Sequence, residues 1–330
     1  MYLPKIAFTM GDPAGIGPEI IVRMLESHPE FAEQAELSVY GSPEVIHDAV
    51  KRFCKKPLPS VELVAATGVK VLHTADGVLS AECGLAAYET VVRAAEDAVA
   101  GKIDAMVTAP VNKAAVCLNG IPFTGHTELV ADICGVRDFA MMQSAGSLRV
   151  VFVTTHIPLA KVPESCTSER IVRTAGLLAE AIRAEGIADP CIGVAAINPH
   201  AGENGNMGSE DEETVRPAVS RMNELGIRAE GPIPPDALFI PSVLRKYDGV
   251  VSMYHDQGHI PFKMLAFDRG VNSTLGLPII RTSVDHGTAF NIAGRGIADF
   301  GSLAEAFRIA LKRAVSKNKV IRNQGNTINV

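Results

Sequence analysis

The 330-residue sequence has no tryptophan, and aromatic residues make up 5% of it. No stretch approaches the roughly 18 uninterrupted apolar residues that a membrane-spanning helix needs. The N-terminus passes from a short apolar run into Gly11-Asp12-Pro13 without a signal-peptide pattern. Positive charge is not in excess, because 31 Lys and Arg stand against 37 Asp and Glu. These absences predict a cytoplasmic protein with no membrane segment and no nucleic-acid partner.

Cysteine is sparse and lacks any CxxC spacing. The six cysteines, at positions 54, 83, 117, 134, 166 and 191, are scattered along the chain. In a chain of this size, that pattern argues against a disulfide framework and against a thiolate zinc site. The cysteines are therefore predicted to be reduced packing residues, and a bound metal would need other ligands.

Three common nucleotide and nucleophile motifs are also missing. The sequence has no GxxxxGK[ST] phosphate loop and no GxSxG elbow, which disfavours the commonest ATPase and hydrolase classes. The glycine-rich stretch from Gly11 to Glu19 follows an apolar run and opens a helical pattern, but it does not match GxGxxG. A conventional Rossmann site is therefore disfavoured, although glycines at this place let the backbone approach a ligand.

The chain alternates short apolar runs with longer helical patterns. Strands are predicted at Ile6–Thr9, Leu37–Tyr40, Ala105–Thr108, Val150–Thr155, Ile192–Ile197 and Gly249–Met253. Helices are predicted at Gly17–Ser27, Leu85–Val99, Ser168–Glu185, Glu212–Leu225 and Ser302–Val315. Uniformly apolar strands separated by helices indicate an α/β fold with a parallel sheet covered on both faces.

Polar clusters follow five of these runs, and three of the clusters contain a histidine. Ligands of open parallel sheets bind outside the carboxyl ends of the strands, so the clusters are expected to share a cleft. His156, His200 and His255 come from separate βα units, a pattern typical of a three-histidine metal site with open positions for substrate. The alternative is three unrelated polar residues that cap their strands.

Further polar residues could bind an anion. His126 and Thr127 lie in a Gly-His-Thr turn that enters a helix, where backbone N–H groups are free to bind an anion, although a simple helix cap explains the turn as well. Lys263, Asn272 and Arg281 together offer cations and a donor for carboxylate and phosphate.

Eight ordered motifs carry a resemblance to a known family. They are GDPAGIGPE, TAPVNK, GHTE, TTHIPL, NPHAGE, PPDALF, YHDQGHIPFK and GLPIIRTSVDHGTAFNIAG. The chain resembles the 4-hydroxythreonine-4-phosphate dehydrogenase family of pyridoxal phosphate biosynthesis essentially end to end. This resemblance implies a two-domain fold like that of isocitrate and isopropylmalate dehydrogenases, with residues 1–120 plus 280–330 in the first domain and 121–279 in the second. It also implies a homodimer with each active site at the interface.

The resemblance assigns roles to the site residues. The metal ligands would be His156, His200 and His255, one of them supplied across the dimer, with zinc favoured and magnesium, manganese or cobalt as alternatives. The substrate-binding residues would be His126, Thr127, Lys263, Asn272 and Arg281. The catalytic candidates are Asp236, Asp256 and Lys263, and the general base stays open between Asp236, Asp256 and a metal-bound water.

The family oxidises the secondary alcohol of a phosphorylated hydroxy acid with NAD or NADP. The resemblance implies 4-phosphohydroxy-L-threonine as substrate and decarboxylation of the keto acid to 3-amino-2-oxopropyl phosphate. D-threonate or D-erythronate 4-phosphate and aromatic cis-dihydrodiol carboxylates are the alternative substrates. A metal-dependent acyl or phosphoryl transferase, or a module that merely binds a phosphorylated acid, is the alternative outside the oxidoreductases.

One segment bears on the cofactor. Residues 286–294 resemble the adenosine-binding loop HGSAPDIAG of isopropylmalate dehydrogenases, in which the aspartate faces the adenine ribose. Asn291 replaces that aspartate here, so discrimination between NAD and NADP is expected to be weak. The predicted cofactor-binding residues are Gly11, Asp12, His286, Gly287, Thr288 and Asn291.

Overall fold

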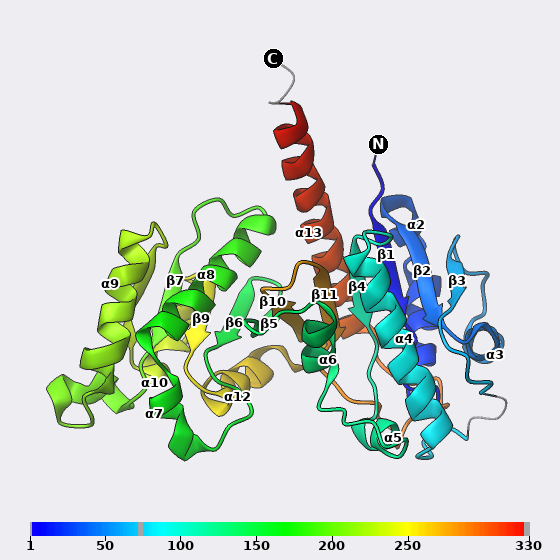
Figure 1. Ribbon diagram of the computed structural model, residues 1–330, viewed down its shortest axis with the longest axis horizontal. Helices are drawn as coiled ribbons and strands as arrows, with labels where there is room; N and C mark the ends of the chain where they lie inside the picture. Colours follow the sequence, from blue (N-terminus) through cyan, green and yellow to red (C-terminus); the bar gives the residue numbers. More distant parts are fainter. Residues whose placement is uncertain (1, 72–74, 327–330) are drawn as a thin grey trace. The chain divides into compact units, whose positions relative to one another are not determined.

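The computed structural model describes residues 2–71 and 75–326, and it divides into two compact units. Unit 1 comprises Met1–Arg137 and Leu277–Val330, and unit 2 comprises Asp138–Gly276 (Figure 1). The domain boundaries expected from the sequence lay near residues 120 and 280. The segment between 120 and 137 belongs to unit 1 because Val130 packs against Val91 and Ala94 in one of its cores. His126 and Thr127 are therefore part of unit 1.

Unit 1 contains five parallel strands in the order β3-β2-β1-β4-β11. Its elements are β1 (Lys5–Thr9), α1 (Gly17–Ser27), α2 (Phe31–Gln34), β2 (Glu36–Gly41), α3 (Pro43–Phe53), β3 (Glu62–Ala65), α4 (Ala81–Val99), β4 (Ala105–Thr108), α5 (Lys113–Cys117), α6 (His126–Ile133), β11 (Ile280–Val284) and α13 (Gly301–Asn326).

Helices cover both faces of this sheet. Ala7 and Met106 pack on one face against Val91, Ala94 and Ala95 of α4, which crosses the strands in Figure 1. On the other face, the ring of Phe8 stacks on Phe307 of α13 with centroids 5.8 Å apart. Because neighbouring residues of a strand point to opposite faces, a run of apolar residues is what a sheet covered on both sides requires.

Unit 2 contains six strands in the order β10-β5-β6-β9-β7-β8, and β5 runs antiparallel to its two neighbours. Its elements are β5 (Ala140–Ala145), β6 (Leu148–Phe152), η1 (Leu159–Lys161), α7 (Val162–Ser165), α8 (Ser168–Ala184), β7 (Ile192–Ala195), η2 (Pro199–Gly205), η3 (Asp211–Val215), α9 (Arg216–Glu224), β8 (Ala229–Ile233), α10 (Pro235–Leu238), α11 (Pro241–Leu244), β9 (Gly249–Ser252), α12 (His255–Ala266), η4 (Phe267–Arg269) and β10 (Val271–Leu275).

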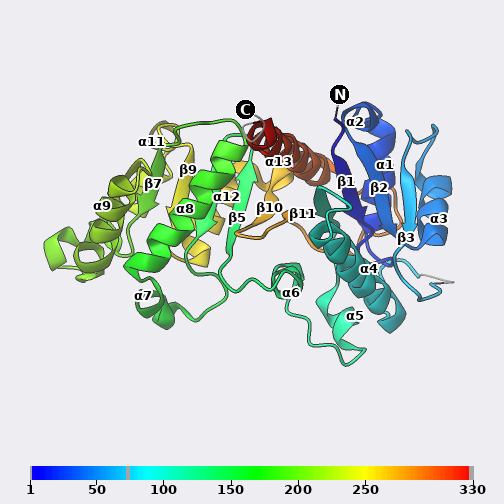
Figure 2. The ribbon, with the colours of Figure 1, turned by 45° about the horizontal axis from the view of Figure 1, so that its top comes forward.

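The unit 2 sheet is also covered on both faces. Val151 and Val251 belong to a core that includes Leu178 and Ile182 of α8, and α8 lies across the strands in Figure 2. The alternate residues of the same strands, among them Val150 and Phe152, form a second core with Phe262 of α12. The predicted α/β fold with a mainly parallel sheet is therefore confirmed.

The element boundaries differ from the sequence expectations in several places. Residues 211–215 form a π-helical turn, and α9 begins only at Arg216 with Pro217 in its first turn. Thr167 caps α8, since its side chain accepts from Arg170 N. The side chain of Ser302 accepts from Asp285 N, so Ser302 contacts the segment after β11.

Within the residues that the structure describes, no helix is long and apolar enough to cross a membrane. The six cysteines are all unpaired, as the sequence predicted.

Two helical glycines differ in the space around them, and substituting each tests how tightly α4 and α8 pack. A Cβ at Gly84 of α4 would lie 2.1 Å from the carbonyl carbon of Ala115, whereas a Cβ at Gly176 of α8 would have Ile227 Cδ1 as its nearest neighbour, at 3.9 Å. Gly84→Ala should therefore lower the free energy of unfolding by about 1–3 kcal/mol through overpacking. Gly176→Ala should raise it by about 0.5–1 kcal/mol because alanine favours the helix.

The shift of the urea unfolding midpoint in each variant checks this pair. Midpoints that move in the same direction for both substitutions would contradict the packing described for α4.

Candidate active site

The loops after β1 and β4 meet in unit 1. Asp12 N donates to Pro110 O at 2.9 Å, and a Cβ at Gly11 would lie 2.6 Å from the same oxygen. Gly11 also has a φ of +73°, so glycine is required here for conformation and for space. The predicted motif at residues 11–19 is therefore held directly beside the TAPVNK motif.

Asp12 is a fully buried carboxylate at this junction. Its Oδ1 accepts from Ala14 N at 2.9 Å, and its Oδ2 has no hydrogen-bond partner among the described residues. Burial raises the pKa of Asp12 to about 6, against the opposing effect of backbone N–H groups. A carboxyl group tuned in this way can hold or release a proton near neutral pH.

A buried guanidinium forms the centre of a second cluster in unit 1. Arg281 on β11 is 3% exposed, and its guanidinium donates to Thr108 Oγ1 at 2.8 Å and to Thr127 Oγ1 at 3.4 Å. Both of these acceptors are neutral hydroxyls. Burial lowers the pKa of Arg281 to about 10, so it stays protonated at neutral pH. The cluster is suited to an anion.

His126 begins α6 in the same cluster. Its Nε2 is buried without a hydrogen-bond partner among the residues that the structure covers. Burial, together with the charges of Arg281 and Lys113, lowers the pKa of His126 to about 3. The imidazole is therefore neutral at physiological pH and can donate or accept one hydrogen bond to a ligand. Thr108 and Lys113 were not predicted as site residues, although both lie in the TAPVNK motif.

The segment that resembles an adenosine-binding loop follows β11. Thr288 O accepts from Ile16 N at 3.1 Å, which ties this loop to the segment after β1. A Cβ at Gly287 would meet nothing within 4 Å, so the backbone there is open to a ligand. Asn291 is exposed, and His286 Nε2 is buried without a hydrogen-bond partner in the described parts of the chain.

Two of the three predicted metal ligands lie together in unit 2. His156 follows β6, His255 begins α12 after β9, and their ring centroids are 5.8 Å apart. Asp256 Oδ1 lies 2.7 Å from His255 Nδ1. Because an ionised carboxylate can only accept, Nδ1 carries the proton and Nε2 keeps its lone pair, which is the common arrangement for a metal-binding histidine.

Gln257 positions the start of α12. Its Oε1 accepts from Met253 N at 2.7 Å, and its Nε2 donates to Ala196 O at 2.7 Å. This buried amide therefore joins the ends of β9 and β7, the strands that precede His255 and His200.

His200 lies on an exposed loop after β7. Residues 200–204 all have positive φ, and the buried carboxylate of Asp211 holds the loop by accepting from Ile197 N at 2.8 Å and Asn198 N at 2.9 Å. Among the described residues of one chain, no group of three His, Cys, Asp or Glu side chains is close enough to hold a metal ion. The donor chemistry of His156, His255 and Asp256 fits a divalent ion, but His200 is not gathered with them.

His259 is a buried residue of this region that was not predicted as part of the site. It lies one turn after His255 in α12 and stacks on Phe152, with ring centroids 4.4 Å apart. Its ring centroid is 4.0 Å from that of His255, and burial lowers its pKa to about 3. The neutral ring therefore packs directly against a predicted ligand. The His-x₃-His spacing in YHDQGH is the sequence signal that could have identified it.

The other predicted residues of unit 2 are spread over three elements. Lys263 is exposed on α12, and Asn272 on β10 has a buried Oδ1 without a hydrogen-bond partner in the described structure. Asp236 is exposed in the first turn of α10, on a different element from the histidines.

The structure thus defines an α/β protein that has a buried cationic cluster after parallel strands of unit 1 and an imidazole cluster after parallel strands of unit 2. Residues 33–310 match the family model described as "Pyridoxal phosphate biosynthetic protein PdxA". The chain therefore belongs to the PdxA family.

Named proteins and solved structures agree with this assignment. The chain is 44% identical over 333 residues to a D-threonate 4-phosphate dehydrogenase of Bordetella bronchiseptica, covering 96% of this chain and 95% of the relative. A crystal structure of 4-hydroxythreonine-4-phosphate dehydrogenase from Klebsiella pneumoniae is 39% identical, with a TM-score of 0.82 over 94% of this chain and 98% of that chain. A beta-decarboxylating dehydrogenase from Thermococcus kodakarensis, 16% identical, shares the fold alone, with a TM-score of 0.52 over 97% of this chain and 89% of that one.

The low pKa of His126 predicts a specific pH dependence of stability. The unfolded chain takes up a proton at His126 near pH 6.5, whereas the folded chain does so only near pH 3. Between these values the unfolded state binds more protons, so the contribution of His126 to the free energy of unfolding falls as the pH is lowered from about 6.5 towards 3. His126→Gln should flatten this part of the plot of urea midpoint against pH.

His47→Gln on the exposed side of α3 is the matched control and should leave the slope unchanged. A His126→Gln profile that is parallel to the wild-type profile would show that the folded imidazole is not held neutral.

Proposed function

We propose that this chain is a metal-dependent dehydrogenase that uses NAD or NADP to oxidise the secondary alcohol of a 4-phosphorylated hydroxy acid. The observation that carries the proposal is the buried guanidinium of Arg281, which is bonded to two hydroxyls beside a neutral imidazole. Such a cluster can bind a dianionic phosphate, because Arg281 is buried and stays protonated at neutral pH. The names of the relatives supply the reaction class.

The substrate is a four-carbon acid with a phosphate at its far end. The resemblance favours 4-phosphohydroxy-L-threonine, with decarboxylation of the oxidised product to 3-amino-2-oxopropyl phosphate. The relative at 44% identity is named for D-threonate 4-phosphate, which is a specific reason to test that acid beside it. The two acids differ in one polar substituent, and one or two contacts can separate them.

The candidate site residues are proposed to bind the substrate, the metal ion and the cofactor in separate groups. Arg281, His126 and Thr127 bind the phosphate, whose binding energy positions the reacting carbon. Lys263 and Asn272 bind the polar end of the acid. A divalent ion held by His156, His200 and His255 would supply a Lewis acid for the alcohol, and a nicotinamide bound by Asp12 and the loop 286–291 would supply the hydride acceptor.

Carboxyl groups of the chain are proposed to hold a proton or to orient a neighbouring side chain. Asp256 holds the ring of His255 with Nε2 free. Asp12 has a raised pKa and can retain a proton at mildly acidic pH. Asp236 and Asp256 are both exposed and are the candidate side chains for the general base.

We also propose that the active enzyme is a cytoplasmic homodimer in which one metal ligand comes from the partner. The exposed side of α12 and the turn after it is strongly apolar: Ile260, Met264, Leu265 and Phe267 are all exposed, and Met264 is 82% exposed. An apolar surface of this kind on the helix that begins with His255 supports a contact between two copies of the chain.

A substrate panel tests the function. Purified enzyme is mixed with 4-phosphorylated threonine, threonate and erythronate derivatives and with NAD or NADP, with and without chelator, and reduced nicotinamide is followed by absorbance. One phosphorylated acid is expected to be oxidised, and the chelator should abolish the reaction until a divalent metal is restored. A transferase or a simple binding module would form no reduced nicotinamide with any of these acids.

The substitution Arg281→Gln tests whether Arg281 binds the phosphate of the substrate. The variant should lower kcat/KM for the phosphorylated acid by about 100-fold, as expected for losing a charge-assisted contact of roughly 3 kcal/mol. The same substitution should change kcat/KM for the dephosphorylated acid by less than about threefold, since the interaction it removes is already missing. Equal losses with both acids would contradict phosphate binding by Arg281.

A further inference from the structure

The loop 286–298 in unit 1 has little regular structure of its own. Ala289, Gly294 and Gly296 have positive φ values of 45°, 76° and 68°. Ile292 N donates to Ala289 O at 3.0 Å and Arg295 N donates to Ile292 O at 3.2 Å, which are turns rather than a helix or a strand. A loop of this kind depends on outside contacts for a single conformation.

A buried carboxylate provides such contacts at the end of the loop. Glu19 in α1 is 1% exposed, its Oε1 accepts from Ala298 N at 2.9 Å, and its Oε2 accepts from Gly296 N at 3.3 Å. Arg23 Nη1 donates to Glu19 Oε1 at 3.0 Å and to Ala298 O at 2.7 Å. The pair therefore fixes both backbone groups of residue 298 and compensates the buried charge of Glu19.

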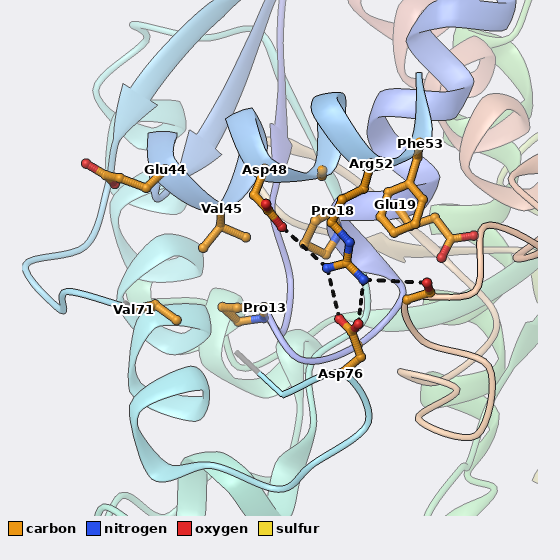
Figure 3. Close-up of a pocket in the computed structure, with 13 residues that line it drawn as sticks. Pro13, Pro18, Glu19, Glu44, Val45, Asp48, Arg52, Phe53, Val71 and Asp76 are labelled. Carbon is orange, nitrogen blue, oxygen red and sulfur yellow. Dashed lines mark hydrogen bonds and ion pairs between the residues drawn. The ribbon is translucent and has the colours of Figure 1, made fainter. Parts of the chain in front are cut away.

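The middle of the loop is tied to a cavity wall. Figure 3 shows Arg52 of α3 between Asp48 and Asp76, in a cavity that Glu19 and Gly294 also line. Arg52 Nη1 donates to Asp76 Oδ1 at 3.2 Å, and Nη2 donates to Gly294 O at 3.5 Å. This exposed network is weaker than the buried Glu19 contacts, because solvent screens it.

The start of the loop is held by the segment that leads into Glu19. Ile16 N donates to Thr288 O, and a Cβ at Gly15 would lie 3.0 Å from the same oxygen. Residues 15–23 therefore hold the loop at two places: at Thr288, among the residues expected to contact the nucleotide, and at residues 296–298, after them.

We propose that Glu19 is a positioning residue that sets nucleotide affinity by fixing the loop 286–298 in its binding conformation. This inference rests on the proposed function, which assigns the loop to NAD or NADP. With the loop already ordered, less of the nucleotide's binding energy is consumed in ordering it. Glu19 itself needs no contact with the nucleotide.

Glu19→Gln tests the hydrogen bonds of the carboxylate alone, because glutamine has nearly the same shape as glutamate. A carboxylate accepts from both backbone N–H groups, whereas the amide of glutamine presents an N–H₂ to one of them. Losing one hydrogen bond to a charged group should raise the nucleotide Kd about tenfold, measured by isothermal titration calorimetry. The Kd for the phosphorylated acid, and kcat at saturating nucleotide, should each change by less than about twofold.

Two further variants complete the experiment. Glu44→Gln is the matched control: Glu44 lines the same cavity, accepts from Ser42 Oγ at 2.7 Å and is exposed, so the nucleotide Kd should not change. Arg23→Gln removes the contacts to Ala298 O and to Glu19 from a partly exposed position, and it should raise the nucleotide Kd about threefold.

The outcomes separate this inference from the function beneath it. A nucleotide Kd that rises in both Glu19→Gln and Arg23→Gln, with the acid Kd and the thermal midpoint close to wild type, supports the positioning role. Wild-type affinity in both variants overturns it while leaving the proposed function intact, and so does an equal loss of affinity for acid and nucleotide with a lowered thermal midpoint. A wild-type enzyme that binds neither NAD nor NADP overturns both.

Discussion

The direction of the parallel strands is the constraint on which the described sites depend. In unit 1, β1, β4 and β11 run the same way, so the loops after them meet, as the contacts of Asp12 with Pro110 and of Ile16 with Thr288 show. In unit 2, β6, β9 and β7 also run the same way, and the loops after them carry His156, His255 and His200, of which His156 and His255 lie together. In each unit, polar side chains therefore lie after the carboxyl ends of the parallel strands.

The polar groups at these edges are held at a cost to stability. Asp12, His126 and His259 have buried polar atoms without partners in the described structure, and burial moves the pKa of each towards its neutral form. Natural cores satisfy almost every buried polar group, so such exceptions mark places built for a ligand or a reaction.

Much of the fold could be read from the sequence, because apolar runs and helical periodicity are local signals. The bounds of β4 and α1 are as expected. Strand β5, in which Gln143 and Ser144 interrupt the apolar residues, and α12, with Pro261 inside it, lack those signals. The site was predicted through strand ends and family motifs. The roles of Glu19 and Gln257 could not be, because each contacts backbone groups distant in sequence, and no spacing along the chain records such a contact.

We propose that imidazoles from separate βα units, one of them from the partner, bind one divalent ion after the carboxyl ends of the strands. Equilibrium dialysis of the purified wild-type protein and of three single variants, His156→Ala, His200→Ala and His255→Ala, against zinc measures it most directly. We expect about one tightly bound ion per chain in the wild type and a loss of affinity of tenfold or more in each variant, because each variant lacks one ligand. Wild-type zinc binding in all three variants would contradict it.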